Sequence, residues 1–396
     1  MVRNAMRWLV LAGLGAGLVP AGFAGEVKAD AAALARQTAD STLECLEIIS
    51  STARNSGAMY YADGIWHSPN QEKSWGTHTA PAAAAAGLWR SGLFDQAPEK
   101  KEQLRRWALD TFDRAIKDHR NPDGSFGDKL SPHTMFFLVE LAPTYLRMEP
   151  VLDAARKEVW KDALVKGVEY MVATGNLFNE KTKRNWYANG NLELDETVLL
   201  YYVFKVTGEE KYREMFERQL AFTLSPDKPR WRNFGLHYDD EPGRPDGSDG
   251  KGYLAENISG HPGYDGDYTH FQSAMAAKLY VASGDPRILR LVNLFLNQIM
   301  QHVDRETWIF DATAGSRHST AMPLTTPAFT VAALQGNRRL FLADLEVQTQ
   351  MTFAHYKKAA KEGWIHPGMY RGLNEELVTL LESALQAAEK SPAPAP

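Results

Sequence analysis

Two kinds of helical segment alternate along the chain, and this alternation limits the fold more than any other feature. Segments such as 99–119 and 286–303 carry charges and place their apolar residues at helical spacing on one face. Between them lie segments that are apolar all round, such as TMFFLVELAPTYL and FQSAMAAKLYVA. A helix that is apolar all round must be buried on every side, whereas an amphipathic helix needs cover on one face only. The sequence therefore predicts pairs of one inner and one outer helix.

The apolar segments form a loose repeat with an interval of about 50–70 residues. Each follows a loop rich in Gly, Asn, Asp, His and Thr, and the five segments begin near His78, His133, Glu196, His270 and Thr326. Such a repeat fits a ring of helical hairpins whose loops meet at one end. We therefore predict an all-α fold, an incomplete (α/α) toroid or barrel of helical hairpins, over residues 25–385. The alternative is a plain helical solenoid.

The two ends of the chain differ from its repeating part. Arg3 and Arg7 precede an apolar run from Trp8 to Val19, and small residues follow up to Ala24. This pattern is typical of a secretory signal peptide at residues 1–24, because the apolar run is too short to span a bilayer comfortably. We expect a periplasmic or secreted protein that does not reside in a membrane. Residues 386–396, which end in SPAPAP, are expected to be a disordered tail.

Charge and composition exclude several kinds of partner. The formal net charge is −5, so nucleic acid is not expected to bind, and an anionic ligand needs a local basic patch. Cys45 is the single cysteine and predicts a small apolar core residue without a disulfide. His261 and His270 lack the spacing of a zinc helix, and DGSDGKG lacks the later Glu of a calcium loop. We expect no metal, no cofactor and a monomer.

Two loops combine basic and aromatic residues, as KTKRNWY at 181–187 and KPRWRNF at 228–234. Arg and Lys can pair with the carboxylate of an acidic sugar, while an aromatic ring covers the face of the pyranose. An anionic polysaccharide is therefore the expected partner. The expected contacts from these loops are Arg184, Trp186, Tyr187, Arg230 and Trp231. The alternative is ordinary packing combined with surface charge.

A third loop, SGHPGYDGDYTH at 259–270, places Tyr, His and Asp directly before a predicted inner helix. Asn189 and Asn191 follow the first basic loop, and His237 follows the second. Tyr, His, an amide and an Arg without a metal suit β-elimination of a uronic-acid polysaccharide. The amide or Arg neutralises the sugar carboxylate, a base removes the C5 proton, and an acid protonates the departing 4-oxygen. A Tyr that acts as the base needs positive charge nearby, because its ordinary pKa is about 10.

The alternating helices, together with RNWYANGN, FGLHYDD and GYDGDYTH in that order, resemble the (α/α)-toroid polysaccharide lyases. In particular the chain resembles polysaccharide lyase family 38, which is active on alginate or glucuronan. The resemblance in architecture covers residues 60–370, and the resemblance in motif covers these three segments. Other toroid lyases carry an Asn-His pair or a double Trp, where this chain has Asn-Trp-Tyr.

The resemblance implies a role for each matching residue. Asn189 or Asn191 would neutralise the carboxylate, and His237 would be the base or a second neutralising group. Tyr268 would be the acid, or both acid and base, with Tyr264 as its substitute. The remaining roles are Arg232 as a source of positive charge and His270 as the group that orients Tyr268 or caps the helix. Because His78 and His133 occupy the same entry position on other predicted inner helices, we expect them to line the groove, with a structural role as the alternative.

Two other functions remain open at this point. A toroid glycoside hydrolase acting on unsaturated or other uronides needs two carboxylates about 5–10 Å apart. The candidates are Glu193, Asp195 or Glu196 paired with Asp265 or Asp267. A non-catalytic periplasmic glycan-binding protein would also use the basic and aromatic loops. The clustering of Tyr and His is less expected of a protein that only binds glycans.

Overall fold

The structure is a computed structural model of the 396-residue chain. It describes residues 31–52, 60–67, 75–127, 131–174, 189–225, 235–258, 261–311, 321–323, 327–335, 342–362 and 372–390. The expected signal peptide at 1–24 lies outside these residues. None of the helices in the described part has the length and apolar character needed to cross a membrane.

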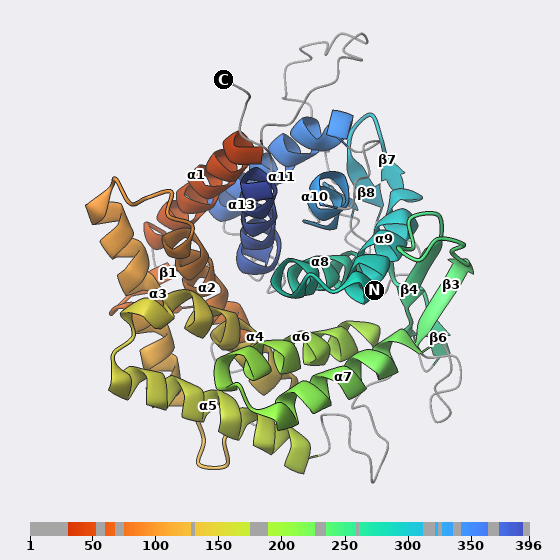
Figure 1. Cartoon of the computed structure of the whole chain (residues 1–396). Coiled ribbons are helices and arrows are strands. Elements are labelled where there is room, and N and C mark those ends of the chain that lie inside the picture. The colour runs from red at the N-terminus through yellow and green to blue at the C-terminus, as the bar shows by residue number, and fades with distance from the viewer. Residues whose placement is uncertain are drawn as a thin grey trace, which may run out of the picture.

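The helices form two concentric rings (Figure 1). The inner ring contains α2 (Trp75–Arg90), α4 (Ser131–Met148), α6 (Gly190–Thr207), α8 (Gly266–Ser283), α10 (Pro327–Leu334), and the π-helical η4 (Leu373–Val378) that continues into α13 (Thr379–Lys390). The outer ring contains α1 (Ala31–Ser50), α3 (Pro98–His119), α5 (Ala154–Ala173), α7 (Glu210–Leu224), α9 (Pro286–Met300) and α11 (Leu342–Glu362). Neighbouring inner helices pack together, and η4 packs against α2 and closes the ring. The predicted (α/α) toroid of helical hairpins is confirmed.

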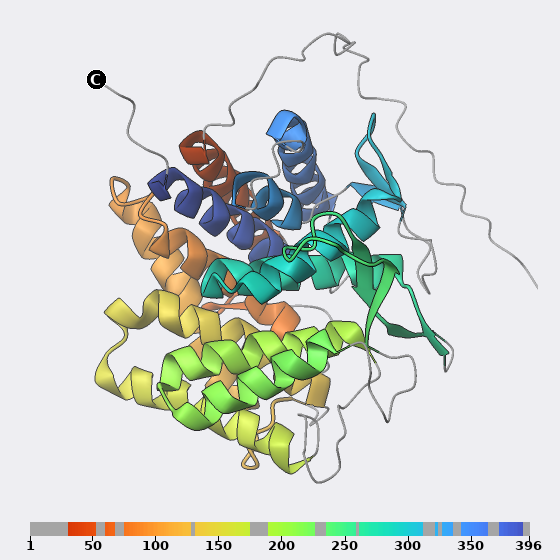
Figure 2. The same ribbon diagram turned by 45° about the vertical axis from the view of Figure 1, so that its right-hand side comes forward.

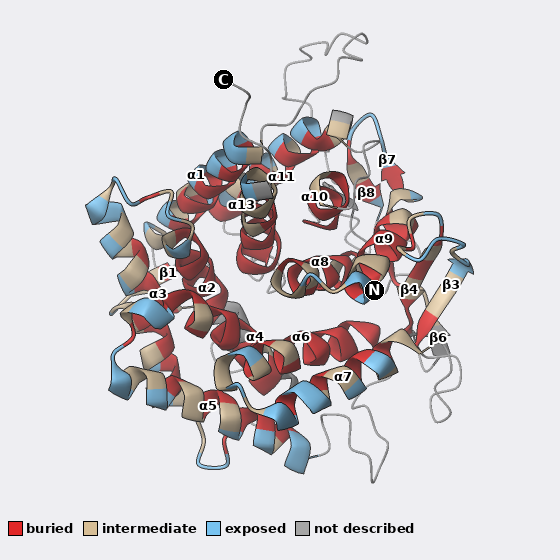
Figure 3. Cartoon of the chain, viewed as in Figure 1, coloured by how far each residue is buried: buried red, intermediate tan, exposed pale blue. Residues whose placement is uncertain are grey.

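Burial follows the alternation seen in the sequence (Figure 3). The first eleven residues of α6, from Gly190 to Leu200, are all buried, whereas α7 is buried on one face and exposed on the other. In α2, alanines 82–86 and Gly87 are small enough for close packing. A Cβ atom at Gly87 would collide with the side chain of Val378 in η4. Small residues therefore let the two ends of the inner ring meet.

The inner segment 372–390 is not among the five that the sequence predicted. It contains Asn374, Glu375 and Glu376, which are nevertheless buried. The prediction of a disordered tail from residue 386 is wrong for residues 386–390, because α13 extends to Lys390. Hydrogen bonds hold this last turn: Gln386 Nε2 donates to Val281 O at 2.9 Å. The residues after 390 lie outside the described part.

The connections differ strongly in length between the two ends of the ring. An inner helix passes to the next outer helix through as few as two residues, 208–209 after α6 and 284–285 after α8. The connections from an outer to an inner helix are longer, as at 174–189 before α6 and 225–265 before α8. Since successive helices in such hairpins are antiparallel, the N-terminal ends of the inner helices lie at one end of the ring, as expected.

Short antiparallel strands occur in these long connections. They are β1 (Tyr60–Ala62), β2 (Ile65–His67), β3 (Leu236–Asp240), β4 (Lys251–Leu254), β5 (Glu256–Ile258), β6 (His261–Gly263), β7 (Val303–Asp304), β8 (Ile309–Asp311) and β9 (Ala321–Pro323). Figure 2 shows the strands between residues 236 and 311 gathered on one side of the helices. The hairpin of β3 and β4 pairs His237 with Tyr253.

The glycine- and aspartate-rich loop at 244–250, between β3 and β4, is bound by α9. Asn293 Nδ2 donates to Asp246 O at 2.8 Å. Asn297 Nδ2 donates to Ser248 O at 3.1 Å and to Gly250 O at 2.6 Å. The composition of DGSDGKG thus has a structural explanation, because the loop turns tightly and presents its carbonyl groups to the amides of a neighbouring helix.

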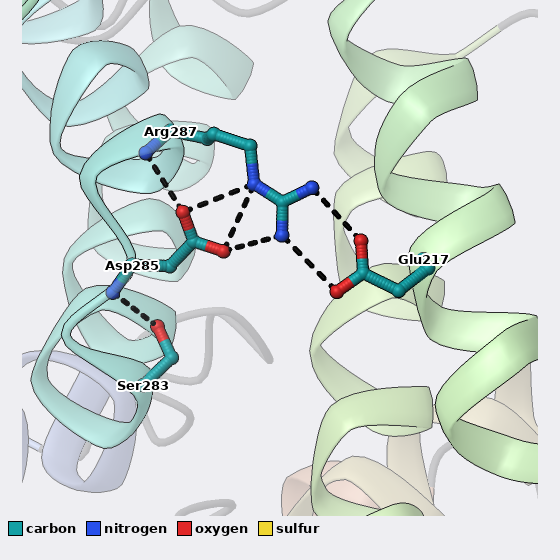
Figure 4. A network of polar contacts seen from close by, with 4 residues as sticks. All are labelled: Glu217, Ser283, Asp285 and Arg287. Carbon is teal, nitrogen blue, oxygen red and sulfur yellow. Dashed lines mark hydrogen bonds and ion pairs between the residues drawn. The ribbon is translucent and has the colours of Figure 1, made fainter. Parts of the chain in front are cut away.

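An exposed ion-pair network joins two neighbouring hairpins across the outer ring (Figure 4). Arg287 of α9 donates to both carboxylate oxygens of Glu217 in α7, at 2.8 and 3.1 Å. It also pairs with Asp285, whose side chain caps α9 by accepting from Arg287 N at 2.8 Å. The side chain of Asp285 therefore caps α9, and the side chain of Arg287 that pairs with it links the two hairpins.

Candidate active site

The N-terminal end of α6 is bonded to the junction of β4 and β5. Gly190 N donates to Ala255 O at 3.0 Å, and Asn191 N donates to Glu256 Oε1 at 2.7 Å. Asn189 occupies the N-cap position but makes no side-chain cap hydrogen bond. Two N–H groups that a helix leaves without internal partners are thus satisfied by residues more than sixty positions further along the chain.

The same segment is bonded to α8 and continues into the β3–β4 hairpin. The side-chain amide of Gln272 in α8 makes two hydrogen bonds to the backbone of Leu254. It accepts from the N–H at 3.1 Å and donates to the carbonyl at 3.0 Å. Gln272 Nε2 also donates to Glu256 Oε1 at 2.8 Å. Ala255 N donates to Gly235 O at 2.9 Å, next to β3. Residues 254–256 therefore join the start of α6, α8 and the strand that carries His237.

Asp265 caps α8 with its own side chain. Its Oδ1 accepts from Tyr268 N at 3.2 Å, and its backbone carbonyl accepts from Thr269 N at 2.8 Å. Asp265 is fully buried, and Tyr268 is half-buried in the first turn. The cap assigns a structural role to the loop GYDGDYTH. It also removes one of the two roles expected of His270, because the helix cap is Asp265.

A row of rings runs from β3 to the residue before β7. His237 stacks on Tyr253 with ring centroids 5.5 Å apart, and Tyr253 meets Tyr264 edge to face at 5.2 Å. Tyr264 in turn stacks on His302 at 5.5 Å. The hydroxyl of Tyr264 is buried and makes no hydrogen bond to any residue that the structure describes. Burial, followed by the nearby carboxylates of Asp265 and Asp239, raises the pKa of Tyr264, so this hydroxyl remains protonated.

The first two turns of α6 carry three buried acids. Glu193 is 5% exposed, while Asp195 and Glu196 are fully buried. Within the described part of the chain, neither carboxyl oxygen of Glu196 makes a hydrogen bond. Burial, and then the charges of Glu193 and Asp195, raise the pKa of Glu196 well above its ordinary value. A carboxyl with a raised pKa therefore lies beside two further acids at the N-terminal end of an inner helix.

His270 lies in a buried aromatic setting on α8. Its ring stacks on Phe310 of β8 with centroids 5.6 Å apart. Burial, and then the proximity of His355 of α11, lower the pKa of His270 to about 4. Burial also lowers the pKa of His355 to about 4. Both imidazole rings are therefore neutral at neutral pH. They interact across the boundary between the inner helix α8 and the outer helix α11.

A buried polar network crosses the ring between α4 and the η4–α13 segment. Arg147 donates to Glu382 Oε1 and to Asn374 Oδ1, each at 2.9 Å. Asn374 also donates to Glu140. Burial, and then the carboxylate of Glu382, raise the pKa of Tyr202 in α6, which brings a third inner helix into the network. Since Asp195 and Tyr202 are seven residues apart on one helix, they share a face.

The other predicted residues are placed as follows. Asn191 is buried at the start of α6, and His133 is half-buried in the first turn of α4. His78 lies in the first turn of α2, where the structure describes the backbone only. The predictions that fall outside the described residues are Arg184, Trp186, Tyr187, Arg230, Trp231 and Arg232. The described part therefore brings together the starts of α6 and α8 with β3 but does not include the basic loops.

Several residues near the starts of α6 and α8 were not expected from the sequence: Tyr253, Glu256, Gln272, His302 and His355. A signal existed for two of them. Gln272 is one of the few polar residues in the mostly apolar run after His270, and Glu256 interrupts the apolar segment YLAENI. Isolated polar residues in buried segments need partners, which predicts that they bond to each other or to a backbone. His302, just after a helix, and His355, within one, offered no comparable signal.

Comparison with known proteins supports the architecture. No family model matches the chain, and no curated protein sequence matches it. A family 76 glycoside hydrolase from a bovine Bacteroides thetaiotaomicron strain has a TM-score of 0.50 at 11% identity, covering 92% of this chain and 79% of its own. A D-mannose isomerase has a TM-score of 0.48 at 10% identity, covering 84% of this chain and 88% of its own.

An unsaturated glucuronyl hydrolase variant from Streptococcus agalactiae has a TM-score of 0.43 at 14% identity, covering 89% of this chain and 90% of its own. At such identities the likeness of the family 76 hydrolase shows the fold alone. The fold is an (α/α) toroid shared with carbohydrate-active enzymes.

Proposed function

We propose that the protein is a polysaccharide lyase that cleaves a uronic-acid-containing polysaccharide, such as alginate, poly-mannuronate or glucuronan, by β-elimination. One observation carries this proposal. Hydrogen bonds from residues 254–256 connect the start of α6, α8 and the β3–β4 hairpin. The elements that carry Asn189, His237 and Tyr268 are therefore all bonded to residues 254–256, which supports the proposal that the three residues act together.

The chemistry assigns one step to each group. Asn189 and Arg232 bind the sugar carboxylate and reduce its charge, which makes the neighbouring C5 proton more acidic. His237 accepts that proton, the bond between C4 and its oxygen breaks, and a C4=C5 double bond forms. Tyr268 donates its proton to the departing oxygen. His237 then releases a proton to water and Tyr268 takes one up, so no water is consumed. Each proton transfer contributes about 10²–10⁴ in rate.

A second candidate function, hydrolysis of a uronide, is favoured by Glu196. A carboxyl whose pKa is raised by burial and by neighbouring acids is the kind of group that glycosidases use as the acid of a carboxyl pair. In this alternative Glu196 or Asp195 of α6 acts together with Asp265 of α8. The residues His237 and Tyr268 have no part in such a reaction.

A single assay separates these functions. The purified protein is incubated with alginate, poly-mannuronate, glucuronan and a neutral glucan, and both the ultraviolet absorbance of a C4=C5 product and new reducing ends are followed. The lyase is expected to produce both on a uronan and neither on the glucan. Reducing ends without the absorbance would instead support the hydrolase, and neither product would contradict both enzymes and leave a binding protein.

Variants then test the assignment of residues. Tyr268→Phe and His237→Gln are each expected to reduce the elimination rate by about 10²-fold or more. Tyr238→Phe is the matched control, because Tyr238 follows His237 on β3 and faces the opposite side of the strand. Glu196→Gln is expected to retain lyase activity. Full activity of both Tyr268→Phe and His237→Gln would overturn the assignment.

A further inference from the structure

We propose that Glu256 is a positioning residue that caps α6 in place of its N-cap residue Asn189 and thereby fixes where the start of α6 lies in the candidate site. The effect of this positioning on substrate recognition rests on the proposed function. The capping itself is a statement about hydrogen bonds at the N-terminal end of α6 and can be tested without any substrate.

The hydrogen bonds at the start of α6 identify the unusual cap. Asn is among the residues preferred at the N-cap, where its side-chain oxygen normally accepts from the second or third N–H of its own helix. Asn189 is the N-cap residue of α6 and makes no such bond. Instead, Asn191 N donates to Glu256 Oε1 at 2.7 Å, and Gly190 N donates to Ala255 O at 3.0 Å.

The neighbouring inner helix shows that the backbone would allow a normal cap. Asp265, the N-cap residue of α8, has φ −128° and ψ 113°, and its side chain accepts from Tyr268 N at 3.2 Å. Asn189 has φ −132° and ψ 113°, which is almost the same conformation. Both are followed by glycine, Gly190 and Gly266. The two helices therefore begin alike and differ in which residue supplies the acceptor.

Glu256 is held firmly in this role. Its side chain is fully buried, and Gln272 Nε2 donates to the same Oε1 atom at 2.8 Å. A carboxylate at a helix N-terminus is also favoured by the helix dipole and by charge-assisted hydrogen bonding. At Gly190 a Cβ atom would collide with the Cβ atom of Leu254, so glycine is required for residues 254–256 to approach the helix. The start of α6 is therefore held against residues 254–256 by the carboxylate of Glu256, which Gln272 fixes in place, and by the close approach that Gly190 allows.

The consequence concerns the position of Asn189. The bond from Glu256 to Asn191 N holds the first turn of α6 against the segment that also joins the strand of His237. Glu256 therefore sets the distance between the Asn189 backbone and that strand. An amide at the N-terminal end of an inner helix suits recognition of a sugar carboxylate, to which its NH₂ group can donate, provided that the helix is placed correctly.

A stability cycle tests the cap with the full-length protein. Asn189→Ala, Glu256→Ala and the double variant are compared by urea unfolding, with Asp265→Ala as the matched control at the helix that caps itself. Asp265→Ala is expected to lower the urea midpoint, because it removes the acceptor that caps α8. In the Glu256→Ala protein Asn189 takes over the cap, so adding Asn189→Ala should cost more there than in the wild-type protein. Equal losses for Asn189→Ala in the wild-type protein and in the Glu256→Ala protein would overturn the cap.

An activity cycle tests the positioning. On the uronan that the wild-type protein cleaves, Glu256→Ala is expected to lower kcat/KM by about 10²-fold, since displacement of a catalytic group by about 1 Å has an effect of this size. Glu256→Gln should recover most of it, because its amide oxygen still accepts from Asn191 N–H. The double variant with Asn189→Ala should be no worse than Asn189→Ala alone.

The outcomes are distinguishable. Additive losses in the activity cycle, or full activity of Glu256→Ala, would contradict the positioning role while leaving the lyase intact. A wild-type protein that cleaves no saccharide would contradict the proposed function, and the stability cycle then decides on the cap by itself.

Discussion

Several buried ionisable residues have pKa values that their surroundings shift towards the neutral form. The pKa of Glu196 is raised because burial and two neighbouring acids disfavour its charge. His270 and His355 are uncharged because burial lowers the pKa of each to about 4. Holding a base neutral in the folded state makes the unfolded state the better proton acceptor at acid pH. These residues therefore link stability to pH.

The histidine pair predicts a loss of stability on acidification. The ordinary pKa of His is about 6.5, and the folded-state value of about 4 lies below it. The free energy of unfolding is thus unaffected by the titration of these two histidines above pH 6.5 and decreases as the pH falls from 6.5 towards 4, because the unfolded state takes up the protons first. By linkage each contributes at most about 3 kcal/mol. Urea unfolding between pH 7 and 4 should show the wild-type protein losing stability relative to a His270→Gln/His355→Gln variant. Parallel curves for the two proteins would contradict the prediction.

At the level of elements, arginines connect helices in two different environments. Arg147 joins α4 to η4 and α13 from a buried position with 6% exposure, through Glu382 and Asn374. Arg287 joins α9 to α7 at the surface, where its side chain is 44% exposed and that of Glu217 is 42% exposed. Exposed ion pairs are screened by water, whereas removing one member of a buried pair leaves the other without compensation. The two contacts should therefore differ greatly in energetic weight.

We predict that Arg147→Ala lowers the free energy of unfolding by about 3–5 kcal/mol, since the Glu382 and Asn374 groups lose their buried partner. Arg287→Ala, its matched control, should cost less than about 1 kcal/mol. Chemical denaturation of both variants at neutral pH measures the difference. Similar losses for the two variants would show that burial does not determine the strength of these contacts.

The alternation of apolar and amphipathic segments was enough to predict the toroid, because burial on all sides leaves a clear mark on α4, α6 and α8. It was not enough for the segment 372–390, whose Asn374, Glu375 and Glu376 resemble a solvent-exposed turn although they are buried. Their burial depends on partners far along the chain, such as Arg147 and Glu140. The role of Glu256 could not be predicted for the same reason, since it accepts a hydrogen bond from Asn191 N, 65 positions away in the sequence. Local patterns do not record such pairings.

At the level of the whole molecule, the fold separates a packed end from a variable end. Two-residue connections such as 208–209 fix one end of the hairpins, and the long connections with β1–β9 occupy the other. Loops on a rigid scaffold can differ without changing its core, which is why chemistry is placed there. This arrangement depends on closure of the inner ring where η4 meets α2. The closure rests on Gly87, which has no room for a Cβ atom beside Val378.

Closure of the ring predicts a specific compensation between these two residues. Gly87→Ala should lower the free energy of unfolding by about 1–3 kcal/mol, because the added methyl group collides with the buried Val378 side chain. Val378→Ala alone should also destabilise, because it leaves a cavity in the core. In the double variant the methyl group added at position 87 occupies the space that the valine side chain vacates. The loss in the double variant should therefore be smaller than the sum of the two single losses by about 1 kcal/mol or more.

Urea unfolding of the four proteins in this cycle measures the coupling between the first and the last inner helix of the ring. Gly243→Ala provides a control for the change from glycine to alanine, since its nearest neighbour is the Asp249 carboxylate in a surface loop. That variant should show no coupling with Val378→Ala. Strictly additive losses for Gly87→Ala and Val378→Ala would mean that α2 and η4 do not meet closely. Strong coupling would establish in solution that the chain closes its inner ring at this contact, on which the common position of the long connections depends.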